Sequence, residues 1–368
     1  MRTDTQSGIT LEYPDALGFA FNPSLLIVRT GGKSMAVAIT DGVDTINLAF
    51  SAYNGAVYGD VQAAVQQFFD VTSYELDYTQ NGLQDTNLAK TLTFSVAVTD
   101  TATPPTIANF SFNVQYVWGA MTPDGKDVFN GLRKITWFTN FPFTFGVYSP
   151  AASGTLIVDN SDGASATISI TDAGMLALNN DTFDANSRTI EIIDYGGTLV
   201  QGTFDTTFDY TFYLDQNLPQ TTIAQITTDK TDEGFYLRWV NRHGFYCYWL
   251  FKAGAESRKV ASIMDFNRND LLAYSDGYGY QRGAGRRQAY ERGDTIPLCV
   301  PLVDSDTFDY LQDITTSPVV DLYVGDDGNG QAQWKGVCVS AGTYTKATTE
   351  LQDFIINLEL PQIPVQRL

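Results

Sequence analysis

The sequence predicts an all-β fold of β-sandwich or β-barrel domains with one or two short accessory helices. Apolar and polar residues alternate with period two in segments that are rich in Thr, Val, Ile and Phe. Clusters of Gly, Asn and Asp separate these segments, as the turns between short strands require. Only 17% of the residues are charged and 13% are aromatic, which is typical of a folded chain and not of a disordered one.

The alternating segments predict strands along the whole chain. In chain order these are Thr91–Val98, Asn109–Val117, Thr155–Val158, Thr167–Ile170, Thr189–Ile193, Phe235–Val240, Phe245–Phe251 and Leu351–Leu360. Asp41-Gly42, Asn54-Gly55 and the segment 325–330 predict turns, because Gly and Asn adopt positive φ at low cost. The segment 241–244 predicts a tight hairpin connection between two aromatic strands.

Two segments have the period of a helix. The first is Asp60–Phe69, in which Asp60 is the expected N-cap. Its apolar stripe consists of Val61, Ala64, Val65, Phe68 and Phe69. The second is a short helix over Thr307–Leu311, which follows the acidic cap Asp304-Ser305-Asp306.

The length of 368 residues allows two or three domains. We expect an N-terminal β domain over residues 1–149, a small inserted β domain over 150–217 and a C-terminal β domain over 218–368. The small residues of 149–154 indicate the first boundary, and the strands that follow are short and polar. The C-terminal domain contains a loop rich in Arg, Gly and Tyr.

Charge is distributed unevenly along the chain. The net charge of −20 argues against nucleic acid or an anionic membrane as a partner, since both repel an acidic surface. Residues 230–300, however, contain eleven Lys and Arg against eight Asp and Glu, a net charge of +3, so the remainder carries −23. Such a chain is better suited to meeting copies of itself than to binding a polyanion.

The first residues of the chain and its apolar runs indicate whether the protein is secreted or inserted into a membrane. Met1–Tyr13 has no apolar core of a secretory signal peptide, and no apolar run reaches the ~20 residues of a membrane helix. We therefore expect synthesis in a reducing cytoplasm and no membrane insertion. Cys247, Cys299 and Cys338 lie in apolar runs without a CxxC motif, which predicts small buried thiols.

The composition excludes several kinds of catalytic and metal site. A single His and three scattered Cys exclude a multi-histidine site and a Cys-rich zinc module. His243 is interpreted as a turn residue and not as a catalytic base, because no nucleophile signature accompanies it. We expect no enzymatic activity, no metal and no cofactor.

Acidic turns and tryptophans have ordinary structural interpretations. The turns 159–163 and 326–329 lack the ligand count of an EF-hand loop, so we expect hairpin turns and not calcium sites. No feature pairs two carboxylates as a glycosidase requires. The five Trp residues lie in strand-like runs, where core packing is the expected role and sugar stacking the alternative.

Tyr274–Arg292 is the segment that we expect to carry an assembly interface. Arg with aromatic residues can stack on bases or sugars, so a nucleic-acid or glycan contact is one interpretation. We favour contact with an acidic surface of another copy, because the rest of the chain supplies that charge. The candidate interface residues are Tyr278, Tyr280, Arg282, Arg286, Arg287 and Arg292.

Several strings resemble those of a known group of proteins. They are FAFNPSLLIV (Phe19–Val28), RKITWFTNFPFTF (Arg133–Phe145), YLRWVNRHGFYCYWLF (Tyr236–Phe251), DTIPLCVPLVDSDTFDYLQDITTSPVVDLYVG (Asp294–Gly325) and KGVCVSAGTYTKATTELQDFIINLELPQ (Lys335–Gln362). Together they resemble tail and baseplate proteins, of the distal-tail type, from phages and prophages of gut Bacteroidales. The resemblance is weakest over 151–217, and it rests on packing residues and not on catalytic motifs.

This resemblance implies a late virion structural protein whose β domains form a homo-oligomeric ring. Its partners would be copies of itself and other phage tail or baseplate proteins, with assembly in the bacterial host cytoplasm. A neck or collar ring is one alternative position in the virion. A carbohydrate-binding β-sandwich that contacts a receptor is an alternative function, and glycoside hydrolysis is a third that no motif supports.

Overall fold

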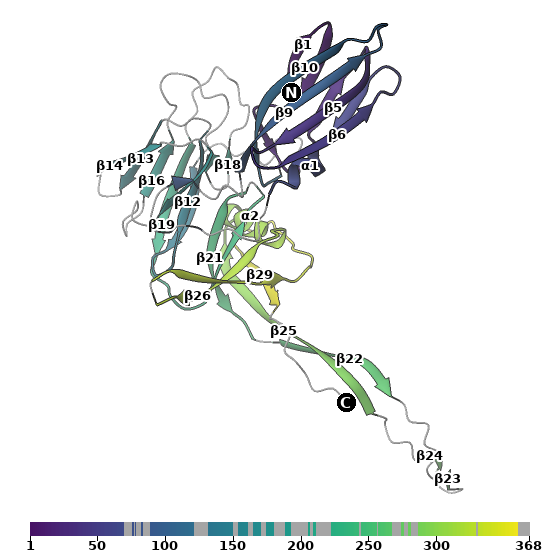
Figure 1. Cartoon of the computed structure of the whole chain (residues 1–368). Helices are drawn as coiled ribbons and strands as arrows, with labels where there is room; N and C mark the ends of the chain where they lie inside the picture. The colour runs from purple at the N-terminus through teal and green to yellow at the C-terminus, as the bar shows by residue number, and fades with distance from the viewer. Residues whose placement is uncertain are drawn as a thin grey trace. The chain divides into compact units, whose positions relative to one another are not determined.

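The computed structural model confirms the all-β prediction, with two short helices among the described residues (Figure 1). The structure describes residues 1–69, 76, 78, 82–83, 89–120, 132–149, 154–160, 165–170, 174–179, 188–192, 205–206, 209–210, 222–242, 244–255, 257–266, 274–275, 279–280, 286–328 and 330–359. The chain divides into two compact units. The first comprises Met1–Asp232, Trp239–Trp249 and Thr316–Pro318, and the second comprises Glu233–Arg238, Leu250–Thr315 and Val319–Leu368. The three-domain division at 149 and 217 stays a prediction.

The first unit begins with a β-sandwich. One sheet has the strand order β1 (Arg2–Gln6), β2 (Ile9–Tyr13), β4 (Leu25–Val28) and β7 (Val57–Asp60). The other has the order β3 (Leu17–Phe19), β10 (Ile107–Val117), β9 (Ala89–Asp100), β5 (Gly32–Thr40) and β6 (Thr45–Ser51). The predicted strands at 91–98 and 109–117 are confirmed as parts of β9 and β10, which pair antiparallel.

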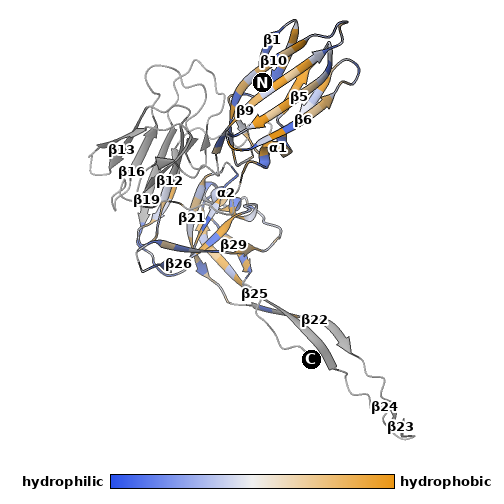
Figure 2. Ribbon diagram, viewed as in Figure 1, coloured by the Kyte–Doolittle hydropathy of each residue, from blue (hydrophilic) through white to orange (hydrophobic). Residues whose placement is uncertain are grey.

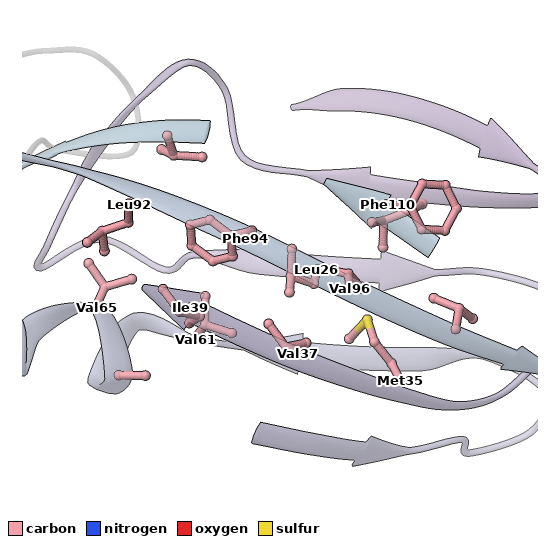
Figure 3. Close-up of a cluster of buried hydrophobic side chains, with 14 of the residues drawn as sticks. Leu26, Met35, Val37, Ile39, Val61, Val65, Leu92, Phe94, Val96 and Phe110 are labelled. Atoms are coloured by element: carbon pink, nitrogen blue, oxygen red, sulfur yellow. The ribbon is translucent and has the colours of Figure 1, made fainter. Parts of the chain in front are cut away.

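Alternation places every second side chain of these strands in one core. On β9 the buried residues are Leu92, Phe94, Val96 and Val98, and the residues between them are less buried. They meet Leu26 of the opposite sheet in a single cluster (Figure 3). Figure 2 shows the apolar residues on β5 and β9. Each fully buried Leu, Val or Phe side chain contributes roughly 1.5–3 kcal/mol, so this core is the main source of stability of the sandwich.

Helix α1 (Gln62–Gln66) covers part of this core, but its N-cap differs from the prediction. The five residues of the expected apolar stripe are all buried. Asp60 is not the N-cap: it pairs with Leu25 at the end of β7, and Val61 occupies the cap position without a side-chain cap. Asp60 therefore pairs within the sheet and does not cap the helix. The Asp60 carboxylate still accepts hydrogen bonds from the backbone amides of Ser24 (3.1 Å) and Gln62 (3.0 Å).

Helix α2 (Ser305–Gln312) confirms the second prediction. Asp304 is its N-cap, and the Asp304 carboxylate accepts a hydrogen bond from the Thr307 amide at 2.8 Å. Phe308 and Leu311 are buried, one turn apart on the same face. A 3-10 turn (Asp313–Thr315) continues from the helix.

Two further sheets of the first unit consist of strands that follow the sandwich in sequence, apart from β8, which precedes β9. One has the order β11 (Leu132–Phe138), β19 (Thr222–Asp229), β16 (Arg188–Ile192), β13 (Gly154–Asn160) and β14 (Ser165–Ile170). The other has the order β18 (Asp209–Tyr210), β17 (Asp205–Thr206), β12 (Thr144–Ser149), β15 (Gly174–Asn179) and β8 (Gly82–Leu83). The strands predicted at 155–158, 167–170 and 189–193 correspond to β13, β14 and β16.

The largest sheet contains the C-terminal strands. Its order is β27 (Ala332–Gly336), β26 (Val320–Asp326), β20 (Phe235–Val240), β21 (Tyr246–Ala253), β25 (Arg286–Val303), β29 (Gln352–Glu359) and β28 (Cys338–Val339), with β22 (Ser257–Phe266) paired to β25. The expected strands 235–240, 245–251 and 351–360 are confirmed as β20, β21 and β29. The β20–β21 hairpin contributes residues to both compact units.

The cysteine prediction is correct in only one clear case. Cys247 is buried, Cys299 is half-buried and Cys338 is exposed. The prediction of a buried thiol at Cys338 is wrong because β28 is a two-residue strand at the end of the sheet, paired only with β29. An apolar run in the sequence therefore does not establish burial at a sheet edge.

Two aspartates hold turns of the sandwich. The Asp41 carboxylate accepts hydrogen bonds from the amides of Asp44 (2.8 Å) and Val43 (3.0 Å), and Lys90 Nζ lies at 3.4 Å. These interactions, led by the Asp44 amide, lower the pKa of Asp41 below its ordinary value. The Asp100 pKa is lowered in the same way, mainly by the Thr106 amide at 2.7 Å.

We expect these two carboxylates to make stability depend on pH in the acid range. Their folded-state pKa is below the unfolded value of about 3.9, so their contribution is present above that pH and is lost as pH falls through the folded pKa. Melting temperatures measured from pH 7 to about pH 2 should fall less for Asp41→Asn and Asp100→Asn than for the wild type. Equal pH dependence in all three proteins would contradict the assignment.

At position 244 the fold permits only glycine without strain. Its φ is +88°, and an added Cβ would lie 2.8 Å from the Trp118 carbonyl oxygen. We expect Gly244→Ala to lower the free energy of unfolding by about 2–4 kcal/mol, through backbone strain and overpacking. Gly55→Ala is the matched control, because φ there is +78° with nothing within 4 Å of the added Cβ, and it should cost only about 1 kcal/mol. Urea unfolding measures both; equal costs would refute the steric argument.

Candidate assembly surfaces

The Arg-rich segment contributes to a two-stranded ribbon. Strand β22 pairs with the first half of β25, from Ser257 opposite Thr295 to Phe266 opposite Arg286. The second half of β25 pairs with β29. In the part of the chain that the structure describes, residues 286–294 therefore have β22 as their one strand partner, and we call 257–266 with 286–294 the ribbon (Figure 1).

The structure brings three of the predicted interface residues onto one strand. Arg286, Arg287 and Arg292 all belong to β25, opposite Phe266, Asp265 and Val260. Tyr280 lies in β24 (Gly279–Tyr280), where it pairs with Tyr274 of β23 (Tyr274–Ser275). Tyr278 and Arg282 lie outside the described residues. For the other four, the structure describes the backbone, and it places Arg286, Arg287 and Arg292 on the ribbon.

An ion pair anchors the ribbon where it joins the sheet. Arg258 Nε lies 3.1 Å from Asp294 Oδ1, across the two strands. The Asp294 side chain is 2% exposed and that of Arg258 is 53% exposed. A buried carboxylate requires a cation or several hydrogen-bond donors, so Arg258 serves Asp294 and is not free to bind a partner. Close by, the Gly254 amide donates to the Pro297 carbonyl at 2.7 Å.

Arg238 is a second basic residue with an internal role. It is buried within β20, its Nε lies 2.9 Å from Asp321 Oδ2, and its guanidinium carbon lies 4.3 Å from the centroid of the Trp334 ring. The planar guanidinium can make both contacts at once. Arg238 belongs to the basic segment 230–300, but a lone Arg within an apolar strand indicates a buried ion pair.

Aromatic residues surround Arg238. Tyr236 packs against Tyr323 and Trp334 with ring centroids 6.3 and 6.0 Å apart, and Tyr323 packs against Trp334 at 5.4 Å. Burial, together with the hydrogen bond to Asp326, raises the pKa of Tyr323 to about 12. The hydroxyl is therefore protonated at neutral pH and donates to Asp326 Oδ1 at 2.8 Å. This cluster stabilises the edge of the sheet formed by β20, β26 and β27.

The predicted hairpin turn at 326–329 is confirmed, since it connects the antiparallel strands β26 and β27. The Asp327 carboxylate accepts a hydrogen bond from the Gln331 amide at 2.8 Å, which closes the turn. In the turn 159–163, Asp159 and Asn160 lie in β13 and the other three residues are outside the described ones. Among the residues that the structure describes, no three His, Cys, Asp or Glu side chains are grouped as a metal site.

His243 also lies outside the described residues, within the predicted hairpin connection. The neighbouring hydrogen bonds support a tight connection: the Gly244 amide donates to the Asn241 carbonyl at 3.0 Å, and the Phe245 amide donates to Asn241 Oδ1 at 2.9 Å. The five tryptophans are all described: Trp137 and Trp239 are buried, and the other three are half-buried. None of them forms an exposed platform for a sugar ring.

Neither the family models nor the curated proteins with which the chain was compared gave a match. Among the described helices, none combines the length and the hydropathy that a membrane crossing needs. The surfaces described above are therefore interpreted from their own geometry and charge.

Removing Arg238 should destabilise the second unit strongly. We expect Arg238→Ala to cost about 3–5 kcal/mol, because it leaves the Asp321 carboxylate without its cation and removes the stacking on Trp334. Lys346→Ala is the control: it breaks the ion pair with Asp309, in which both side chains are exposed, and it should cost far less. Chemical denaturation of both variants measures the difference, and equal costs would contradict the buried-pair argument.

Proposed function

We propose that the protein is a structural component of a phage tail or baseplate that assembles with copies of itself into a ring. The observation that carries this proposal is the ribbon, which holds three of the basic candidate residues on one strand. A two-stranded hairpin is only marginally stable alone in water. Since the described residues provide no further strand beside the ribbon, a partner that covers it is the best explanation.

The charge distribution supports a second copy as that partner. Residues 230–300 carry +3 and the remainder −23. Arg238 and Arg258 are held by Asp321 and Asp294, which leaves Lys259, Arg286, Arg287 and Arg292 as the other basic residues of β22 and β25. Opposite charges on two surfaces of the same chain favour head-to-tail contact. Head-to-tail contacts form a ring when the rotation between neighbouring copies closes.

The β-sandwich architecture and the resemblance of the packing strings support a virion protein of the distal-tail or baseplate type. Other tail or baseplate proteins would then be further partners, and assembly would take place in the host cytoplasm. A neck or collar ring is the alternative position in the particle. Receptor contact through a carbohydrate-binding β-sandwich is the alternative function.

We expect the purified protein to form an oligomer of defined mass and to be present in purified virions. Size-exclusion chromatography with light scattering measures the first, and immunogold electron microscopy of particles measures the second and locates the ring. Because the proposed contacts are ionic, the oligomer should weaken as salt is raised. A protein that is monomeric and missing from particles would disprove the proposal, and binding on a glycan array would favour receptor contact.

A charge-reversal variant tests the role of the ribbon. Arg286→Glu combined with Arg287→Glu should raise the dissociation constant of the oligomer by about tenfold or more, since it replaces attraction by repulsion. Lys230→Glu combined with Lys335→Glu is the matched control, because both are exposed cations outside the ribbon and the net charge changes by the same amount. If both variants weaken the oligomer equally, net charge and not the ribbon controls assembly.

A further inference from the structure

In the described part of the chain, strand β6 forms an open edge of the sandwich. Residues 107–114 of β10, beyond the three residues of β3, also have one strand partner there, but Arg2 donates to the Asn113 carbonyl at this edge at 3.0 Å. The other three edge strands are short or charged: β1 contains Arg2 and Asp4, β3 has three residues, and β7 has four and ends in Asp60. Strand β6, with the sequence TINLAFS, has seven residues, no charge and no Pro. It pairs with β5 without a bulge, from Thr45 opposite Thr40 to Ser51 opposite Ser34. Natural edge strands avoid this combination because it invites pairing with another strand.

The register identifies the peptide groups that face away from β5. The Ala52 amide donates to the Lys33 carbonyl at 3.0 Å, so these two residues form a hydrogen-bonded pair. Hydrogen-bonded and non-bonded pairs alternate along an antiparallel ladder. The peptide groups that point to the open edge are therefore those of Thr45, Asn47, Ala49 and Ser51, and no partner for them occurs in the described part of the chain.

The side chains of β6 favour the addition of a strand. Ile46, Leu48 and Phe50 pack against the core and are only half-buried at the open edge. A strand added beside β6 would continue the hydrogen-bond ladder and would also cover these apolar side chains. Strand addition of this kind obtains its affinity from main-chain hydrogen bonds.

Charge favours one occupant for this edge. Between Lys33 and Lys90 the chain contains seven Asp and Glu and no Lys or Arg. Pairing of β6 with β6 of a second copy would bring two such acidic segments together, which is unfavourable. The ribbon has the opposite charge: 257–266 with 286–294 contains five Lys and Arg against three Asp and Glu.

The ribbon also has a suitable free edge. Strand β22 has β25 as its strand partner, and no strand lies on its other side among the described residues. Its ladder is regular from Ser257 to Ser262, before the register shifts. These six residues approach the seven of β6 in length.

We propose that β6 of one copy binds β22 of the ribbon of a second copy, so that the five-stranded sheet of the sandwich continues into the ribbon. This inference rests on the proposed self-assembly and names the two surfaces that meet. The contact is head-to-tail, since an edge of the first unit receives a strand of the second unit of another molecule. The ribbon obtains the additional strand neighbours that a two-stranded hairpin lacks.

Hydrogen–deuterium exchange of the full-length protein tests the pairing directly. The amides of Thr45, Asn47, Ala49 and Ser51 should exchange at least about tenfold more slowly in the oligomer than in dilute monomer, because they gain hydrogen bonds. The amides of Ile46, Leu48 and Phe50 should change much less, as they are already bonded to β5. Equal exchange of the outward amides in both states, or a protein that stays monomeric, would overturn the inference.

Two variants of β6 separate the edge from the rest of the surface. Asn47→Pro removes an outward amide without touching the β5 ladder, and Ala49→Lys adds a cation to the edge strand. Each should raise the dissociation constant by about tenfold or more while the melting temperature stays near that of the wild type. Ser95→Lys is the control, because Ser95 is an exposed residue of the same sheet on the inner strand β9, where it pairs with both β5 and β10. If the Asn47→Pro variant assembles with the dissociation constant of the wild type, the proposal is overturned.

The ribbon is tested by Lys259→Glu combined with Arg292→Glu. The control is Lys230→Glu combined with Lys335→Glu, which changes the net charge equally at exposed positions outside the ribbon. Loss of protection at β6 in the double variant supports the ribbon as the occupant; retained assembly with a protected β6 would identify another strand and overturn the proposal. Failure of the β6 pairing can be distinguished from failure of the proposed function. A protein that is present in virions but has a freely exchanging β6 retains its proposed function and refutes only the pairing.

Discussion

The requirement that every backbone amide and carbonyl of a strand finds a partner governs this structure. Within the sheets, antiparallel ladders meet the requirement, and alternation then places every second side chain in a core. At the sheet edges the requirement is met only by water or by another strand. Of the four edge strands, β1, β3 and β7 are short or charged, whereas β6 is longer and uncharged. The same requirement underlies the proposed pairing of the ribbon with a second copy.

The burial of each charged side chain decides whether it forms an internal ion pair. Asp294 and Arg238 are buried, and each has an opposite charge close by, on Arg258 and Asp321. Such pairs maintain the geometry of the sheet and of the base of the ribbon, and each pair adds no net charge. The segment 230–300 therefore combines internal ion pairs with basic residues on the ribbon strands. The net charge of this segment therefore sums residues that form internal ion pairs and residues that lie on the ribbon strands.

The local pattern was a good guide wherever the partner of a residue lies nearby in sequence. Alternation predicted β9, β10 and β20, and the acidic cap predicted α2, because each depends on residues within a few positions. The cap of α1 was predicted incorrectly, since Asp60 is held by Leu25 of β4, thirty-five positions away. Cys338 was predicted incorrectly as well, because burial depends on the place of β28 in the sheet.

The sequence by itself determined the fold class, most of the strands, the acidic balance and the Arg-rich segment, because composition and period are properties of the chain alone. Only the tertiary structure decided which strands are neighbours. Strand order makes β6 an edge, places Arg286, Arg287 and Arg292 on the ribbon and joins Arg238 to Asp321. These contacts connect residues far apart in sequence, and a period-two pattern is the same for an edge strand and an inner strand. The candidate assembly surfaces therefore emerge from the strand order, although their residues are visible in the sequence.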